Sequence, residues 1–93
     1  MSTSDNKFSK TVIINNSLGI HARPAGMIAK LATTAESGIW IIKDGEKIDA
    51  SSIIDILSLL CEQGTSLTLE IDNQTDKKIL NDIIELIRQG FGE

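Results

Sequence analysis

The stretch IWIIKDGEKIDA, residues 39–50, contains two short runs joined by Asp44 and Gly45. An Asp-Gly pair readily adopts the positive backbone φ angles that the tight turn of a two-residue hairpin requires. The first run is rich in β-branched and aromatic side chains, which are typical of strands. This stretch therefore predicts two antiparallel strands, over residues 39–43 and 46–50, and the remaining elements are assigned outward from it.

Two more strands are expected on either side of this hairpin. Residues 8–14 contain a run of β-branched side chains and are followed by a cluster of turn-forming residues at 15–17. Further along the chain, Leu67, Leu69 and Ile71 alternate with polar residues. Such alternation is typical of a strand with one face in solvent. The sequence therefore predicts four strands.

A first helix is expected after the first strand. Pro24 has a fixed φ near the helical value and no N–H group, so we place it at the first helical position. The helix should end near Ser37 and Gly38. Spacings of three and four residues define one core-facing stripe on it. This stripe consists of Ala25, Ile28, Leu31, Ala32 and Ala35.

Two further helices complete the pattern. The second should start at residues 51–52, with Ser52 as its N-terminal cap, and should stop near Gly64. The third should have Thr75 or Asp76 as its cap and should close at Gly90. The side chains that the third helix directs inward are expected to be Leu80, Ile83, Ile84 and Ile87.

The expected element order is β-α-β-β-α-β-α, which describes an α+β fold. The economical arrangement is one four-stranded antiparallel sheet with three helices on one face. Residues 1–7 are small, polar or charged and lack periodicity, so we interpret them as a disordered N-terminal tail. Residues 8–93 are interpreted as a single domain, because a chain of 93 residues can build one modest hydrophobic core.

Composition argues against several classes of function. The formal net charge of −4 and the lack of a basic stripe disfavour a nucleic-acid partner. No apolar run approaches the roughly 20 residues that cross a bilayer, so no direct membrane insertion is expected. One cysteine and no secretion signal at the N-terminus predict a cytoplasmic protein. A metal site is not expected either, because one histidine and one cysteine leave too few ligands.

The most informative candidate site is the heptapeptide LGIHARP at residues 18–24, which contains the only histidine and the only proline of the chain. His21 would lie just outside a helix N-terminus, where unpaired N–H groups attract an anion and disfavour an imidazolium. The backbone of Ala22, Pro24 and Ala25 would form this phosphate-binding end, and the Arg23 guanidinium matches phosphate oxygens. The alternative interpretation is that His21 is only a capping or half-buried residue.

Two motifs resemble those of a known family. Residues 19–25, GIHARPA, resemble the active-site signature of the histidine-containing phosphocarrier protein (HPr) family of the bacterial phosphotransferase system. Residues 49–54, DASSII, resemble the second motif of that family, in which a serine caps a short helix. The resemblance extends over nearly all of the chain after the tail. It implies the HPr-like open-faced β-sandwich, in agreement with the deduced element order.

The resemblance also implies a function. His21 would accept a phosphoryl group on Nδ1 from phosphorylated enzyme I and pass it to an enzyme IIA-type protein, while Arg23 stabilises the phosphate in both transfers. Such a protein acts as a carrier with a phosphohistidine intermediate rather than as a turnover enzyme. No cofactor is expected, and we expect the chain to act as a monomer.

The branch of the family is left open between sugar uptake and nitrogen-related regulation. Lysine is found in some relatives where this chain has Thr33, Ser51 and Asp55. Leu18 and the ending at residues 89–93 look more like the nitrogen-related, NPr-like branch. Charge differences of this kind tune association and specificity without fixing a pathway.

Ser52 has two interpretations. As a helix cap it is explained by local structure alone. The resemblance adds a regulatory role, because in some bacteria the matching serine is phosphorylated by a serine kinase, which would then be a partner of this chain. An alternative function follows, in which the chain is a non-catalytic regulatory binding module that acts through the surface of the Ser52 helix.

A partner-binding surface is expected beside His21. The second helix contains more apolar residues than one buried stripe needs, so some of them are either core residues or part of an exposed docking surface. The candidate partner-binding residues are Ile20, Ile53, Ile54 and Leu57. Cys61 is interpreted as a packing residue or a half-exposed thiol, and a Cys61–His21 nucleophile pair is not expected because no third group would orient it.

Overall fold

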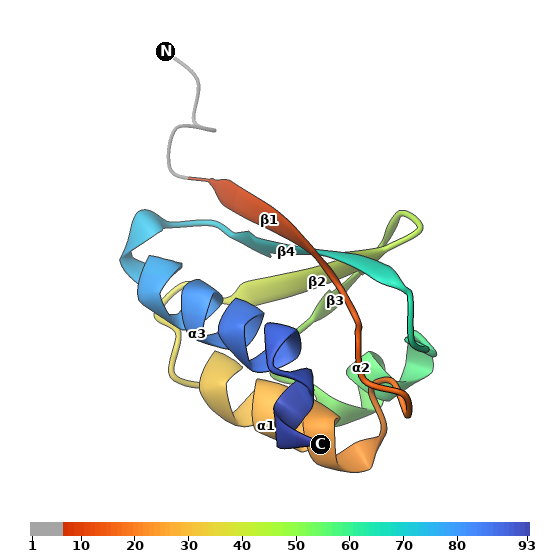
Figure 1. The fold of residues 1–93 in the computed structure, drawn as a ribbon. Coiled ribbons are helices and arrows are strands. Elements are labelled where there is room, and N and C mark those ends of the chain that lie inside the picture. Colours follow the sequence, from red (N-terminus) through yellow and green to blue (C-terminus); the bar gives the residue numbers. More distant parts are fainter. Residues whose placement is uncertain (1–6) are drawn as a thin grey trace.

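The computed structural model describes residues 7–93 (Figure 1). The predicted tail of residues 1–7 lies outside the described residues, apart from Lys7, which precedes the first strand. Among residues 7–93, no helix is both long enough and apolar enough to span a bilayer.

Four antiparallel strands form one sheet with the spatial order β1-β4-β2-β3. The strands are β1 (Phe8–Ile13), β2 (Ile39–Lys43), β3 (Glu46–Asp49) and β4 (Ser66–Ile71). The predicted hairpin joins β2 to β3, and both of its turn residues have positive φ angles, 50° at Asp44 and 83° at Gly45. These values belong to the mirror-image turn that matches the twist of paired strands. The predicted α+β fold is thus confirmed.

The helices lie on one face of the sheet, and the hydrophobic core lies between the two layers (Figure 1). They are α1 (Ala22–Ala32), α2 (Ile53–Ser58) and α3 (Lys77–Arg88), with 3-10 turns η2 (Gln74–Asp76) and η3 (Gly90–Gly92) on either side of α3. The alternation in β4 directs its apolar side chains into this core. The side chains predicted to face inward from β4 and α3 are all buried: Leu67, Leu69, Ile71, Leu80, Ile83, Ile84 and Ile87.

Helix α1 differs from the prediction at both ends. It begins at Ala22, so Pro24 is the third helical residue rather than the first. Proline fits there because the N–H groups of the first turn have no intrahelical acceptor. The helix ends at Ala32 rather than near residues 37–38, because the hydroxyls of Thr33 and Thr34 donate to carbonyls of the last turn. Ala35, predicted on the helix, packs half-buried on the core beyond it.

Helix α2 is shorter than predicted, because it ends at Ser58 rather than near Gly64. Leu60 has a left-handed φ of 54°, which the helix cannot continue through. The ammonium group of Lys43, on β2, donates to the carbonyls of Leu59 and Leu60 at 2.7 and 3.2 Å. This lysine therefore satisfies carbonyls that the helix leaves free.

The start of the third helical segment also differs from the prediction. The side chain of Asn73 caps the η2 turn by accepting the N–H of Thr75. Asp76 occupies the N-cap position of α3, but its buried carboxylate accepts the backbone N–H groups of Glu36 and Ser37 instead of capping the helix. Asp76, which the local sequence predicts as a cap, therefore binds the distant loop at residues 36–37 instead.

The loop between β1 and α1 runs beside the chain that follows α2. The N–H of Ile14 donates to the Thr65 carbonyl at 2.9 Å, and the N–H of Ile20 donates to the Cys61 carbonyl at 2.8 Å. Gly19 lies in the left-handed region at φ 66°, and a β-carbon on it would lie 2.4 Å from the Cys61 carbonyl oxygen. Only glycine fits at this close approach.

Replacing Gly19 by alanine should destabilise the fold more than the same change at Gly64. Gly64 has a φ of 89° but open space where a β-carbon would be, so Gly64→Ala should lose only the conformational term of about 1–2 kcal/mol. Gly19→Ala adds a collision with backbone that cannot move aside easily. Urea denaturation of the two variants measures the difference, and equal losses of unfolding free energy would contradict the close approach.

Candidate functional site

His21 occupies the N-cap position of α1 in an extended backbone conformation. Its carbonyl accepts the first intrahelical hydrogen bond, from the Ala25 N–H at 3.0 Å. Its side chain does not cap the helix, and 38% of the side-chain surface is exposed. The imidazole is therefore not used to cap the helix and is partly accessible from solvent.

The first turn of α1 is open to an anion. It contains no acidic residue and no side-chain cap. Ala22 is exposed, whereas Pro24 and Ala25 are buried against the core. The N–H groups at the start of a helix and the positive end of its dipole favour a negative group at this place.

Arg23 lies on the same turn and faces the C-terminal segment of the chain. Its Nη2 donates to the Phe91 carbonyl at 3.0 Å and to Oε2 of Glu93 at 3.1 Å. Its Nη1 donates to the sulfur of Met27 at 3.2 Å. About half of the guanidinium side chain, 52%, remains exposed. Arg23 is thus held beside His21 while still reachable from solvent.

Glu93 is the member of the site that the sequence analysis missed. Its Oε2 lies 2.6 Å from Nε2 of His21 and also accepts from Arg23, while its Oε1 accepts from the amide of Asn16 at 2.9 Å. The Asn16 hydrogen bond, followed by those of His21 and Arg23, holds the pKa of the Glu93 carboxyl below its usual range, although desolvation opposes this. Glu93 is therefore ionised at neutral pH.

The C-terminal segment runs from the end of α3 to the start of α1 (Figure 1). Gly90, Phe91 and Gly92 all have positive φ angles, between 59° and 76°. The Phe91 side chain is 1% exposed and anchors this turn in the core. A run of three left-handed residues is irregular structure, so periodicity gave no signal that Glu93 would meet a histidine 72 positions earlier.

An apolar surface lies next to the His21 loop. Its exposed members are Leu18 (70%), Ile53 (44%), Ile54 (79%) and Leu60 (74%). Leu57 is half-buried, and it lines a shallow groove together with Ile20, which is 6% exposed. Of the apolar residues of α2, Ile56 belongs to the core and the others face the surface or its edge. We call Leu18, Ile53, Ile54 and Leu60 the apolar patch.

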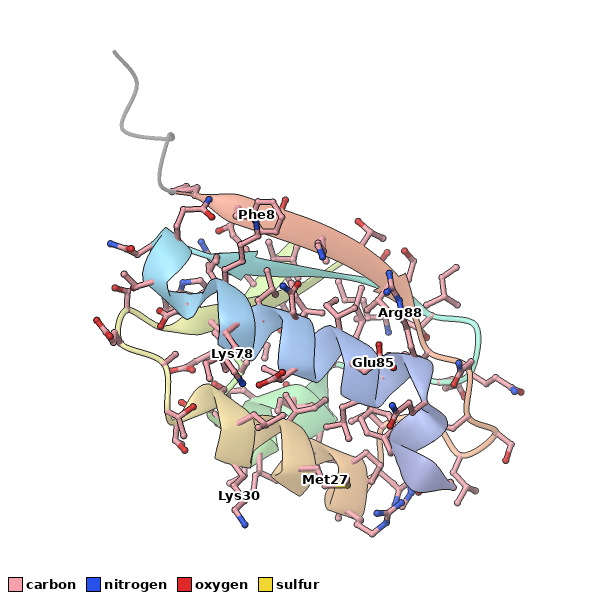
Figure 2. The ribbon with its side chains drawn as sticks, turned by 60° about the vertical axis from the view of Figure 1, so that its left-hand side comes forward. Phe8, Met27, Lys30, Lys78, Glu85 and Arg88 are labelled. Carbon is pink, nitrogen blue, oxygen red and sulfur yellow. The ribbon has the colours of Figure 1, made fainter. Side chains whose placement is uncertain are left out.

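Two basic side chains of the described residues, Lys43 and Lys30, are placed by the structure on β2 and α1; Lys43 donates to the carbonyl of Leu60, a member of the patch. Figure 2 shows Lys30 on α1 pointing away from the body of the protein, and Met27 on the same helix. Lys30 is exposed and is the basic residue in the last turn of α1. Arg23 is linked to the imidazole through Oε2 of Glu93, which both side chains contact.

Ser52 is the N-cap of α2, and its hydroxyl accepts the N–H of Asp55 at 3.2 Å. Its neighbour Ser51 donates through both N–H and hydroxyl to the Asp49 carboxylate. The predicted role of Ser52 as the N-cap of α2 is thus confirmed. The regulatory role that the resemblance implies for Ser52 stays a prediction.

Cys61 is 4% exposed, and burial raises the pKa of its thiol despite the nearby Lys43 charge. Its backbone carbonyl accepts the N–H of Ile20 in the His21 loop, and the residue is one of those that line the groove. Within residues 7–93, no three His, Cys, Asp or Glu side chains gather in a way that could hold a metal ion.

Comparisons with known proteins agree with this geometry. The family model described as "PTS HPr component phosphorylation site" matches residues 8–89. The chain is similar to phosphocarrier protein HPr of Cupriavidus necator, with 34% identity over 83 residues, covering 89% of this chain and 92% of that protein. It is also similar to phosphocarrier protein NPr of Proteus mirabilis, with 35% identity over 85 residues, covering 90% of this chain and 94% of that protein.

The fold is also similar to that of a solved structure. The crystal structure of HPr-C-His from Thermoanaerobacter tengcongensis superimposes with a TM-score of 0.84 at 34% identity, covering 92% of this chain and 97% of that one. The match to the family model, the two relatives and this structure all include the loop and helix that hold His21. The chain belongs to the HPr phosphocarrier family of the bacterial phosphotransferase system.

Proposed function

We propose that this chain accepts a phosphoryl group on His21 from phosphorylated enzyme I and passes it to a histidine of an enzyme IIA-type protein, in the cytoplasm. Membership of the family implies phosphotransfer partners of these classes. The observation that supports the proposal most directly is the placement of a half-exposed imidazole at an open helix N-terminus, beside a guanidinium.

The site suits reversible transfer. Phosphoryl transfer requires positioning and neutralisation of charge more than covalent help from the protein. Arg23 and the N–H groups of the first turn of α1 would offset the charge of a phosphoryl group on His21. Because both side chains remain open to solvent, the bound phosphate is stabilised only moderately and can move on. The transfer needs no cofactor, since both reacting groups are imidazoles.

The apolar patch would supply the docking surface. Protein interfaces have an apolar centre surrounded by polar groups, and a few well-packed side chains dominate the affinity. Ile54, with 79% of its surface exposed, has no structural reason to be apolar within this chain. A partner that covers the patch would place its own active site against His21, because the His21 loop is fixed to the chain after α2.

The branch of the family depends on the acceptor. The chain is as similar to an NPr as to an HPr, so we propose either a sugar-branch or a nitrogen-branch IIA protein as acceptor. Offering the phosphorylated chain to one protein of each type, and comparing transfer rates, assigns the branch. The steering charges around the patch are expected to affect mainly the association rate.

Phosphorylation should depend on His21 alone. Incubation with phosphoenolpyruvate and enzyme I should give one acid-labile phosphate per chain in the wild type and none in His21→Ala. Ser52→Ala is the matched control, because it removes the other candidate phosphorylation site and should keep the label. A wild-type chain that stays unlabelled but still binds a partner through α2 would favour the binding-module alternative.

Arg23→Ala should slow phosphoryl transfer much more than it destabilises the fold. Loss of one charged hydrogen-bond donor to the phosphate should lower kcat/KM by about tenfold or more. The unfolding free energy should change by less than about 1 kcal/mol, because the side chain is half-exposed. Arg88→Ala, on α3 (Figure 2), removes the same charge elsewhere and should leave the rate unchanged. A stability loss typical of a core truncation would contradict this.

Ile54→Ala should weaken partner binding without weakening the fold. Removing an apolar side chain at the centre of an interface is expected to cost about 1–2 kcal/mol of binding free energy, which is roughly a tenfold rise in Kd or KM. The matched control is Ile13→Ala on β1, where an isoleucine is 57% exposed but lies outside the patch. Isothermal titration with enzyme I measures both variants, and equal effects would remove the patch from the interface.

A further inference from the structure

Leu60 follows the last turn of α2 and combines two unfavourable properties. It adopts a left-handed conformation, with a φ of 54°, and 74% of its surface is exposed. In the left-handed region the β-carbon of a leucine is crowded against the following carbonyl oxygen. An exposed leucine also gains little from the hydrophobic effect within its own chain. Packing within the protein therefore does not account for a leucine at this position.

The backbone conformation of Leu60 has a structural reason of its own. Leu59 and Cys61 are both 4% exposed, so the chain leaves the helix between two side chains that stay in the core. A left-handed residue just after a helix allows such a change of direction, and glycine or asparagine usually occupies that position. The feature that needs an explanation is therefore the side chain of Leu60 and not the turn that contains it.

Lys43, at the end of β2, holds this turn in place. Its ammonium group donates to the Leu59 carbonyl at 2.7 Å and to the Leu60 carbonyl at 3.2 Å. These two carbonyls belong to the peptide groups on either side of the Leu60 α-carbon. One ammonium group therefore restricts both dihedral angles of Leu60, φ and ψ, and with them the direction in which its side chain leaves the backbone.

The position of Leu60 relative to His21 is also fixed. The N–H of Ile20, the residue before His21, donates to the carbonyl of Cys61 at 2.8 Å. Cys61 directly follows Leu60 in the chain. Ile20 and Leu60 also line the same shallow groove. A protein that brings its own reacting group against His21 therefore lies close to the Leu60 side chain.

We infer that Leu60 is a partner-binding residue whose direction is set by Lys43, and that it packs against apolar side chains of the phosphotransfer partners. Such partners are proteins, as membership of the family implies. The inference rests on the proposed function and deepens it, because it adds a positioning residue that lies outside the apolar patch. A side chain that is oriented before binding loses less conformational freedom in the complex, so this arrangement favours association.

Leu60→Asn separates binding from folding. Asparagine tolerates the left-handed conformation better than leucine does, so the midpoint of urea denaturation should stay the same or rise. The apolar contact with the partner is lost, so the Kd for enzyme I, measured by isothermal titration, should rise by about tenfold. Ile13→Asn, at an exposed isoleucine outside the patch, is the matched control and should leave this Kd unchanged.

Two results with Leu60→Asn would overturn the inference. An unchanged Kd for enzyme I would remove Leu60 from the contact. A loss of stability typical of a core truncation would show that the leucine serves the fold instead.

Lys43→Met tests the positioning role, because methionine keeps an apolar side chain of similar length and removes the ammonium donors. We expect the KM for phosphorylation by enzyme I to rise while kcat stays unchanged, since the ammonium group binds carbonyls rather than the imidazole. Lys43→Arg retains charged donors, so its KM should stay close to that of the wild type.

The double variant shows whether Lys43 acts through Leu60. In the Leu60→Asn background, Lys43→Met should not raise the KM further, because the side chain that Lys43 orients is absent. The same rise in both backgrounds, or no rise in either, would overturn the role given to Lys43.

Failure of this inference is distinguishable from failure of the proposed function. If the wild type never acquires acid-labile phosphate from enzyme I, the proposed function is wrong and the inference is wrong with it. If the wild type is phosphorylated and Leu60→Asn binds enzyme I with the same Kd, the function stands and the role given to Leu60 is wrong.

Discussion

The site depends on one constraint, which is that the pairing of β1 with β4 continues beyond both strands. Backbone hydrogen bonds from Ile14 to Thr65 and from Ile20 to Cys61 keep the loop before α1 against the chain after α2. Gly19 permits this contact because it has no β-carbon. The loop therefore enters α1 at a fixed place, with His21 as the N-cap. The His21 ring, the helix opening and the apolar patch all take their positions from this contact.

Much of the fold follows from local sequence, and the exceptions share a physical cause. Residues near one another in the chain determine three features: the Asp44–Gly45 turn, the Ser52 cap and the buried stripe of α3. Their sequence patterns were therefore sufficient to predict them. The early end of α2 is supported by Lys43 from a strand, and the Asp76 carboxylate serves a distant loop. Contacts of this kind between distant segments leave no periodic signal in the sequence.

The candidate site divides in the same way. His21 and Arg23 were visible because they belong to one short motif at a helix start, where dipole and geometry indicate an anion site. The contact of Glu93 with His21 was not visible, because three left-handed residues redirect the chain after α3. The result is a site in which the imidazole comes from the start of one helix and the carboxylate that contacts it comes from beyond the end of another.

The partial exposure of the His21 ring has a further consequence for how long a phosphoryl group would stay on it. Under the proposed function, the exposure that lets protein partners reach His21 also admits water, which is a competing acceptor for the phosphoramidate. A carrier with this geometry would lose part of its phosphate to water. Its phosphorylated fraction at steady state would reflect the balance between phosphorylation by the donor, transfer to the acceptor and spontaneous hydrolysis.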